Sequence, residues 1–205
     1  MSQKIIIFDF DGVIADGLPA LGKIYNEIAG RYNLKQVNFE ALRDLTSREI
    51  VKRIDLPFYK LPFFIREVKK RFRSEINSIK TFAGMKETLF ELKNRGCQLG
   101  IITSNSKENV KEFLKNNEID FFDFLYSDTN LFGKKRKIKN LLRKLKVDSK
   151  NIIFVGDETR DIEAAKKSGV ISAAVTWGAN SKNTLEKQNP DFIIEKPEEL
   201  IKILV

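Results

Sequence analysis

The chain has 205 residues, 42% hydrophobic and 32% charged, a balance typical of one globular domain or of one domain with an insert. It contains no histidine and one cysteine, Cys97, which excludes Ser-His-Asp and Cys-His catalysis, histidine-ligated zinc and an internal disulfide. No apolar run reaches the roughly 18 residues of a membrane span. The first predicted strand begins almost at Met1, which leaves no room for a signal peptide, so we expect no membrane association and a cytoplasmic location.

The chain carries 37 Lys and Arg against 28 Asp and Glu, a formal net charge of +9. Two basic runs, 66–73 and 134–139, lie in segments whose apolar residues recur at helical spacing. We interpret both runs as solvated helix faces. Nucleic-acid binding is the less favoured interpretation of the same charge.

Short apolar runs alternate with helical patterns along most of the chain. The predicted strands are Lys4 to Phe8, Gln98 to Ile102, Phe121 to Tyr126, Asn151 to Val155, Ile171 to Val175 and Asp191 to Ile194. The predicted helices between and after them are Met85 to Asn94, Lys107 to Asn116, Lys135 to Leu145, Arg160 to Lys167 and Glu198 to Leu204. This alternation predicts βαβ units, and therefore an α/β fold with a three-layer, Rossmann-like parallel sheet.

One segment interrupts the alternation, because residues 16–80 contain no good strand. Helices are predicted there from Leu18 to Tyr32, from Leu42 to Ile54 and from Leu61 to Ile79. We therefore expect a helical domain at 16–81, inserted after the first strand of a core domain made of 1–15 and 82–205.

Two carboxylates, Asp9 and Asp11, directly follow the first predicted strand. Buried carboxylates without a partner are costly, and two hard oxygen donors side by side suit Mg²⁺. The competing interpretation is a simple turn at Asp11-Gly12.

Polar residues also follow the later strands, at the edge where open α/β sheets bind ligands. Thr103 and Asn105 follow the second strand, Lys134 comes after the third, and Asp157 with Asp161 follows the fourth. Carboxylates, hydroxyls and a lysine together suit phosphoryl transfer. Alternatives stay open: Thr103 as a helix cap, Asp161 as a first-turn acid favoured by the helix dipole, and Lys134 on the surface.

These residues resemble the four motifs of the haloacid dehalogenase superfamily, in the family's order. The motifs are Asp9-Phe10-Asp11-Gly12-Val13, Ile101-Ile102-Thr103, Lys134, and Gly156-Asp157 with Asp161. The resemblance covers nearly the whole chain, since the helical insert matches the family's small cap. The stretch Val175-Thr176-Trp177-Gly178 looks like phosphoglycolate phosphatases and their relatives.

The resemblance implies roles for individual residues. Asp9 would be the nucleophile that forms an aspartyl-phosphate, and Asp11 would be the general acid and base. Mg²⁺ would be held by Asp9, the carbonyl of Phe10 and Asp157, with Asp161 in or near its outer shell and Asp11 kept among the metal candidates. Thr103, Asn105 and Lys134 would bind phosphate, with Lys135 as the competing lysine.

Asp11 also favours a phosphate ester over an organic halide as the substrate, because the dehalogenases of this superfamily lack an acid at the equivalent position. We expect a Mg²⁺-dependent phosphatase of a small phosphorylated metabolite, similar to phosphoglycolate. Val13, which mutases also use, keeps a β-phosphoglucomutase-like phosphotransferase as the alternative.

Overall fold

A six-stranded, all-parallel sheet forms the centre of the protein, with the strand order β3-β2-β1-β4-β5-β6. The computed structural model describes residues 4–53, 56–127, 134–145 and 147–204. The strands are β1 (Ile5–Phe8), β2 (Gln98–Thr103), β3 (Phe124–Ser127), β4 (Ile152–Gly156), β5 (Ile171–Val175) and β6 (Phe192–Ile194). The predicted parallel α/β sheet is confirmed.

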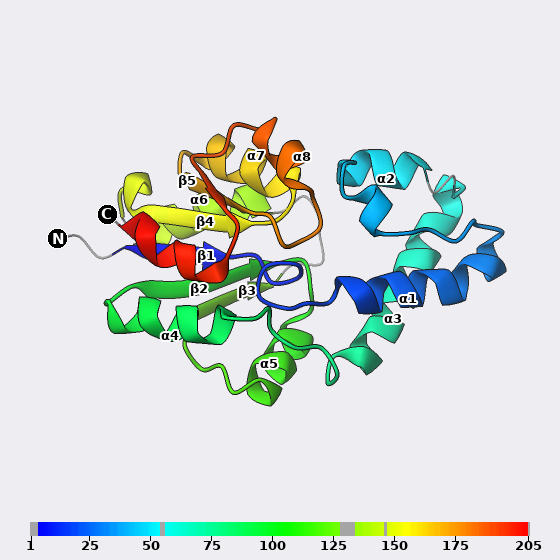
Figure 1. The fold of residues 1–205 in the computed structure, drawn as a ribbon, viewed down its shortest axis with the longest axis horizontal. Helices are drawn as coiled ribbons and strands as arrows, with labels where there is room; N and C mark the ends of the chain where they lie inside the picture. The colour runs from blue at the N-terminus through cyan, green and yellow to red at the C-terminus, as the bar shows by residue number, and fades with distance from the viewer. Residues whose placement is uncertain (1–3, 54–55, 128–133, 146, 205) are drawn as a thin grey trace.

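Helices cover both faces of the sheet (Figure 1). Ile6 and Phe8 of β1 pack in one apolar cluster with α4 (Met85–Asn94) and α5 (Lys107–Asn116). Ile5 and Ile7 point to the other face, into a second cluster with α6 (Lys134–Leu145) and α7 (Thr159–Ser168). The alternation of side chains along a buried strand thus produces the three layers.

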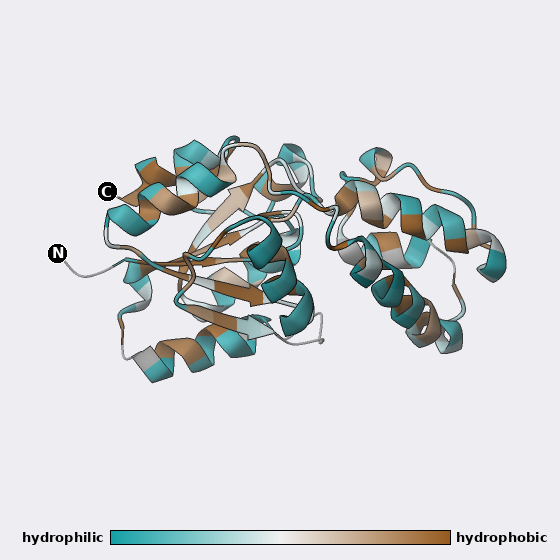
Figure 2. Ribbon diagram, turned by 90° about the horizontal axis from the view of Figure 1, so that it is seen from below, coloured by the Kyte–Doolittle hydropathy of each residue, from teal (hydrophilic) through white to brown (hydrophobic). Residues whose placement is uncertain are grey.

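The segment between β1 and α4 forms a separate group of helices beside the sheet, which we call the helical insert (Figures 1 and 2). It contains α1 (Leu18–Ala29), α2 (Ser47–Arg53) and α3 (Leu61–Glu75), with 3₁₀ turns at Gly30–Tyr32, Glu40–Leu42 and Phe58–Lys60. Its own small core includes Tyr25, Ile28 and Phe64. The two connecting segments pair with each other, since Asp16 N donates to Lys80 O at 2.9 Å.

Several element boundaries differ from those expected from sequence. β3 begins at Phe124. Just before it, the Asp123 carboxylate accepts a hydrogen bond from Leu99 N of β2 at 2.8 Å, in place of a backbone carbonyl. The helix predicted to reach Ile79 ends at Glu75, and the C-terminal helical segment, Pro197–Leu204, is a 3₁₀ helix. A short helix, α8 (Lys182–Glu186), was not predicted, although Ser181 supplies its N-cap.

None of the helices in the described part of the chain is long and apolar enough to cross a membrane.

Gly100 of β2 tests how tightly the sheet is packed. A Cβ atom at this position would overlap the ring of Phe124 on β3. We expect Gly100→Ala to lower the free energy of unfolding by about 1–3 kcal/mol, the usual cost of overpacking, as measured by urea denaturation.

Gly30 provides the matched control, because it has helical backbone angles and a Cβ atom added there would meet no neighbouring group within 4 Å. Gly30→Ala should raise the free energy of unfolding by about 0.4–1 kcal/mol. Equal effects of the two substitutions would contradict the packing described between β2 and β3.

Candidate active site

The candidate site lies where β1 and β4 end side by side in the middle of the sheet. Phe8, the last residue of β1, is in register with Ile101 of β2 and Val155 of β4. The chain order reverses at this point, and such a switch point is where open α/β sheets form a ligand-binding crevice. Asp9 continues β1 into this crevice, with its backbone N donating to Val155 O at 2.9 Å.

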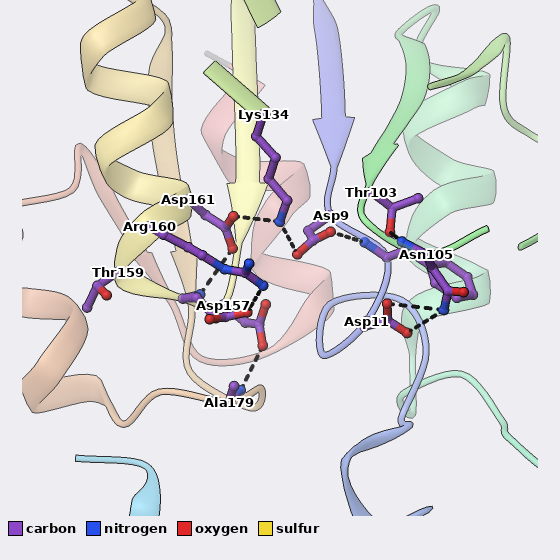
Figure 3. A network of polar contacts seen from close by, with 12 residues as sticks. Asp9, Asp11, Thr103, Asn105, Lys134, Asp157, Thr159, Arg160, Asp161 and Ala179 are labelled. Atoms are coloured by element: carbon purple, nitrogen blue, oxygen red, sulfur yellow. Dashed lines mark hydrogen bonds and ion pairs between the residues drawn. The ribbon is translucent and has the colours of Figure 1, made fainter. Parts of the chain in front are cut away.

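Lys134, the first residue of α6, links two buried carboxylates (Figure 3). Its Nζ contacts Asp9 Oδ2 and lies 2.6 Å from Asp161 Oδ1. Burial alone would lower the pKa of Lys134, but the charges of Asp161 and Asp9 outweigh it and raise that pKa above its usual value. Lys134 is thus charged and inside the site, and not on the surface; the side chain of Lys135 lies outside the described residues.

Burial also raises the pKa of the Asp9 carboxyl, to about 7, although Lys134 opposes the shift. The second oxygen of Asp9 accepts from Phe10 N at 2.8 Å. The carboxyl is therefore fixed in orientation, and positive charge nearby is needed to keep it ionised.

Asp157 follows β4 and is surrounded by backbone. Its Oδ2 accepts from Ala179 N at 2.7 Å, while Oδ1 has no hydrogen-bond partner among the described residues. A Cβ atom on Gly12 or Gly178 would overlap this carboxylate, so both positions need glycine, and Gly12 also has a φ of +78°. Burial, followed by the charges of Glu158, Asp9 and Asp161, raises the pKa of Asp157 well above its usual value.

The donor set fits a divalent cation. Asp9, Asp157 and Asp161 are all buried, and each can offer a carboxylate oxygen within 4.8 Å of the others. Three hard oxygen donors and an unpartnered buried oxygen on Asp157 suit Mg²⁺. A cation here would favour the ionised form of each carboxylate and so offset the cost of burying them.

The carbonyl of Phe10 is hydrogen-bonded within its own turn. Its oxygen accepts from Ile14 N and Ala15 N, each at 3.0 Å, and from Val13 N at 3.4 Å. These three bonds stabilise the turn that follows Asp9. The resemblance places this carbonyl among the metal ligands, and that role stays a prediction.

Asp11 lies across from the acidic cluster and is held by an amide. Asn105 Nδ2 donates to both of its oxygens, at 3.0 and 3.2 Å (Figure 3). Burial raises the pKa of Asp11 to about 6, and the bond from Asn105 and the charge of Lys134 limit the rise. A carboxyl with a pKa near neutrality can both give and take a proton.

Thr103 and Asn105 shape the turn after β2. Thr103 is buried, and its Oγ1 accepts from Asn105 N at 2.9 Å. Asn105 Oδ1 accepts from Ser106 N and from Asn109 Nδ2. The N-cap of α5 is Ser106 and not Thr103. Asn105 thus orients Asp11, whereas the hydroxyl of Thr103 can still donate a hydrogen bond.

Asp161 has two partners, because its other oxygen accepts from Glu158 N at 3.2 Å at the start of α7. It therefore caps the helix as well as contacting Lys134. Between these two acids in sequence, Arg160 forms an ion pair with Glu158 and reaches over the acidic cluster (Figure 3). Sequence reasoning did not select Arg160, although it lies inside the fourth motif.

Comparison with known proteins assigns the family. Residues 6–175 match the family model described as haloacid dehalogenase-like hydrolase. A phosphoglycolate phosphatase from Synechococcus elongatus is 32% identical over 204 residues, covering 98% of this chain and 96% of the relative. The chain belongs to the haloacid dehalogenase-like hydrolase family, as its motifs predicted.

Two further similarities extend over the full length. Pyrophosphatase PpaX from Oceanobacillus iheyensis is 28% identical over 210 residues, with 100% of this chain and 98% of the relative covered. The haloacid dehalogenase-like hydrolase SP0104 from Streptococcus pneumoniae superposes with a TM-score of 0.85 at 21% identity, covering 100% and 99% of the two chains. The second comparison supports the fold.

Magnesium should stabilise the protein through the acidic cluster. A ligand that binds only the folded state at 100 times its Kd adds about 2.7 kcal/mol to the free energy of unfolding. We expect Mg²⁺ to raise the melting temperature of the wild type, and Asp157→Asn to abolish most of that increase because it removes a buried anionic donor.

Asp120→Asn is the control, since Asp120 is an exposed carboxylate outside the cluster. It should keep the full Mg²⁺-induced shift. An undiminished shift in Asp157→Asn would place the cation elsewhere.

Proposed function

We propose that this protein is a Mg²⁺-dependent phosphatase that hydrolyses a small phosphomonoester, similar to phosphoglycolate, through an aspartyl-phosphate. The observation that carries the proposal is that two carboxyls, Asp9 and Asp11, lie at one edge of the sheet in different environments. Asp9 contacts Lys134 next to Asp157 and Asp161, while both oxygens of Asp11 accept from the neutral amide of Asn105.

The first step uses Asp9 as the nucleophile. One of its carboxylate oxygens attacks phosphorus, and the bond from phosphorus to the ester oxygen breaks. Asp11 gives its proton to the departing oxygen, which leaves as an alcohol. Lys134 would offset the negative charge of the phosphoryl oxygens, and the Thr103 hydroxyl would donate to one of them.

The second step reverses the role of Asp11. Now ionised, it takes a proton from water as the water oxygen attacks the phosphorus of the aspartyl-phosphate. Phosphate departs, and Asp9 is again a carboxylate. Bound at Asp9, Asp157 and Asp161, Mg²⁺ would supply positive charge against the phosphoryl oxygens.

The substrate class is supported by the relatives. The relative at 32% identity is named a phosphoglycolate phosphatase, and the next one a pyrophosphatase. Both names describe removal of phosphate from a small anionic molecule. We propose the same class of substrate here, and a division of the chain into a core of 1–15 and 82–205 and a cap of 16–81 that closes over the site.

Substitutions of Asp9 and Asp11 should separate their two roles. Asp9→Asn should abolish phosphate release from p-nitrophenyl phosphate, because no nucleophile remains. Asp11→Asn should slow hydrolysis of phosphoglycolate by about 10²–10⁴-fold, the usual contribution of a general acid or base. Burst kinetics and steady-state phosphate release measure both effects.

The nature of the leaving group sharpens this test. Nitrophenolate departs without a proton, so Asp11→Asn should slow the burst phase with p-nitrophenyl phosphate less than with phosphoglycolate. Full activity of Asp9→Asn would refute the proposal. A requirement for a sugar bisphosphate, with little phosphate released, would indicate a mutase.

A further inference from the structure

The loop between β5 and α8, residues 176–181, contacts both the acidic cluster and the helical insert. On the side of the cluster, Ala179 N donates to Asp157 Oδ2 at 2.7 Å (Figure 3), and Asn180 N donates to Asp157 O at 3.1 Å. Asn180 Oδ1 accepts from Thr159 N at 3.0 Å, in the first turn of α7. The loop therefore fixes both the carboxylate and the backbone of Asp157.

The same loop is bonded to the insert between its 3₁₀ turn at Glu40–Leu42 and α2. Asn180 Nδ2 donates to Leu45 O at 2.8 Å and to Arg43 O at 3.3 Å. Ser181 N also donates to Arg43 O, at 2.9 Å, and Arg43 Nη2 donates to Thr176 O at 2.6 Å. These bonds join residues more than 130 positions apart in the chain.

Asn180 is the one side chain among these that bonds to both sides. It is 1% exposed, its two amide hydrogens go to the insert, and its amide oxygen goes to α7. A buried amide that loses its acceptors must rotate or be reached by water. Rotation would break the bond from Thr159 N to the amide oxygen of Asn180. Movement of the insert would therefore change the hydrogen bonding of the turn that carries Asp157.

We propose that Asn180 is a positioning residue that couples docking of the helical insert to the placement of Asp157 for its cation. The inference rests on the proposed function for its catalytic consequence, though not for its effect on cation binding. Asp157 is held in place when the insert is docked, and it loosens when the insert leaves. Cation binding and docking of the insert therefore strengthen each other.

The loop contains its own reporter, because Trp177 is the only tryptophan in the chain. Its Nε1 donates to Val13 O at 3.2 Å, and its ring lies 6.2 Å from that of Phe82, centroid to centroid. Val13 and Phe82 belong to the two segments that connect the insert to the sheet. Tryptophan fluorescence should therefore change when the loop or these segments rearrange.

The test is a titration of the full-length protein with Mg²⁺ alone, followed by Trp177 fluorescence. Asn180→Ala should shift the midpoint to roughly 10-fold higher Mg²⁺ or more, the usual effect of removing a group that orients a metal ligand. Arg43→Ala removes the bond to Thr176 O and an ion pair with Glu40 within the insert, and it leaves the Arg43 carbonyl in place. It should shift the midpoint in the same direction by less. It also replaces Asn180→Ala if that variant fails to fold.

Asp44→Ala is the matched control, since Asp44 accepts a hydrogen bond from Ser181 Oγ at the exposed rim of the same interface. Among the described residues it has no hydrogen bond to the turn that carries Asp157. It should leave the Mg²⁺ midpoint within about twofold of the wild type. Limited proteolysis of the insert, with and without Mg²⁺, measures docking independently. Mg²⁺ should protect the insert in the wild type and in Asp44→Ala, and less in Asn180→Ala.

A wild-type Mg²⁺ midpoint in folded Asn180→Ala, or in Arg43→Ala if the former does not fold, would overturn the coupling. So would an equal shift in Asp44→Ala, because general loosening of the interface would then explain it. Failure of the proposed function gives a different result: no ester is hydrolysed, while the Mg²⁺ midpoints still rank as expected.

Discussion

The burial of several carboxylates at the centre of the sheet is the constraint on which the rest of this structure depends. Asp9, Asp157 and Asp161 lie together where water is largely excluded, and repulsion among them adds to the cost of burying each one. Lys134 offsets part of that cost from the start of α6. Other groups fix the carboxylates by hydrogen bonds, including Ala179 N at Asp157 and Glu158 N at Asp161.

This arrangement gives two neighbouring acids different properties. Asp9 and Asp11 are separated by one residue, yet Asp9 faces Lys134 and Asp11 faces the neutral amide of Asn105. The turn between and after them separates their environments, and three backbone N–H groups bonded to the Phe10 carbonyl stabilise that turn. One sheet edge can thereby hold two carboxyls in unlike environments, as the proposed nucleophile and the proposed proton carrier require, in a chain without histidine.

Much of this could be predicted from the sequence, because parallel strands bring their carboxyl ends to one edge. The positions of Asp9, Thr103 and Asp157 follow from locating β1, β2 and β4. The orientation of the Phe10 carbonyl could not be predicted, since it depends on backbone angles within one turn. The bonds behind the role proposed for Asn180 could not be predicted, because its partners Arg43 and Leu45 lie in a distant loop that has no strand or helix periodicity. Its place in the loop after β5 is the sequence signal that points to Asn180, because the other site residues also follow strand ends.

The strand order has a consequence for how the chain folds. β1 is synthesised before β2 and β4, but it pairs with β2 on one side and with β4 on the other. One edge of this apolar strand therefore stays without its partner until most of the chain exists, and contacts of such long sequence separation form slowly. Asp157 is held by Ala179 in the loop after β5, so the acidic cluster that begins with Asp9 is complete only after that loop has been made. A nascent chain, or one shortened at its C-terminus, should therefore expose an unpaired, aggregation-prone edge of β1 before its acidic cluster is complete.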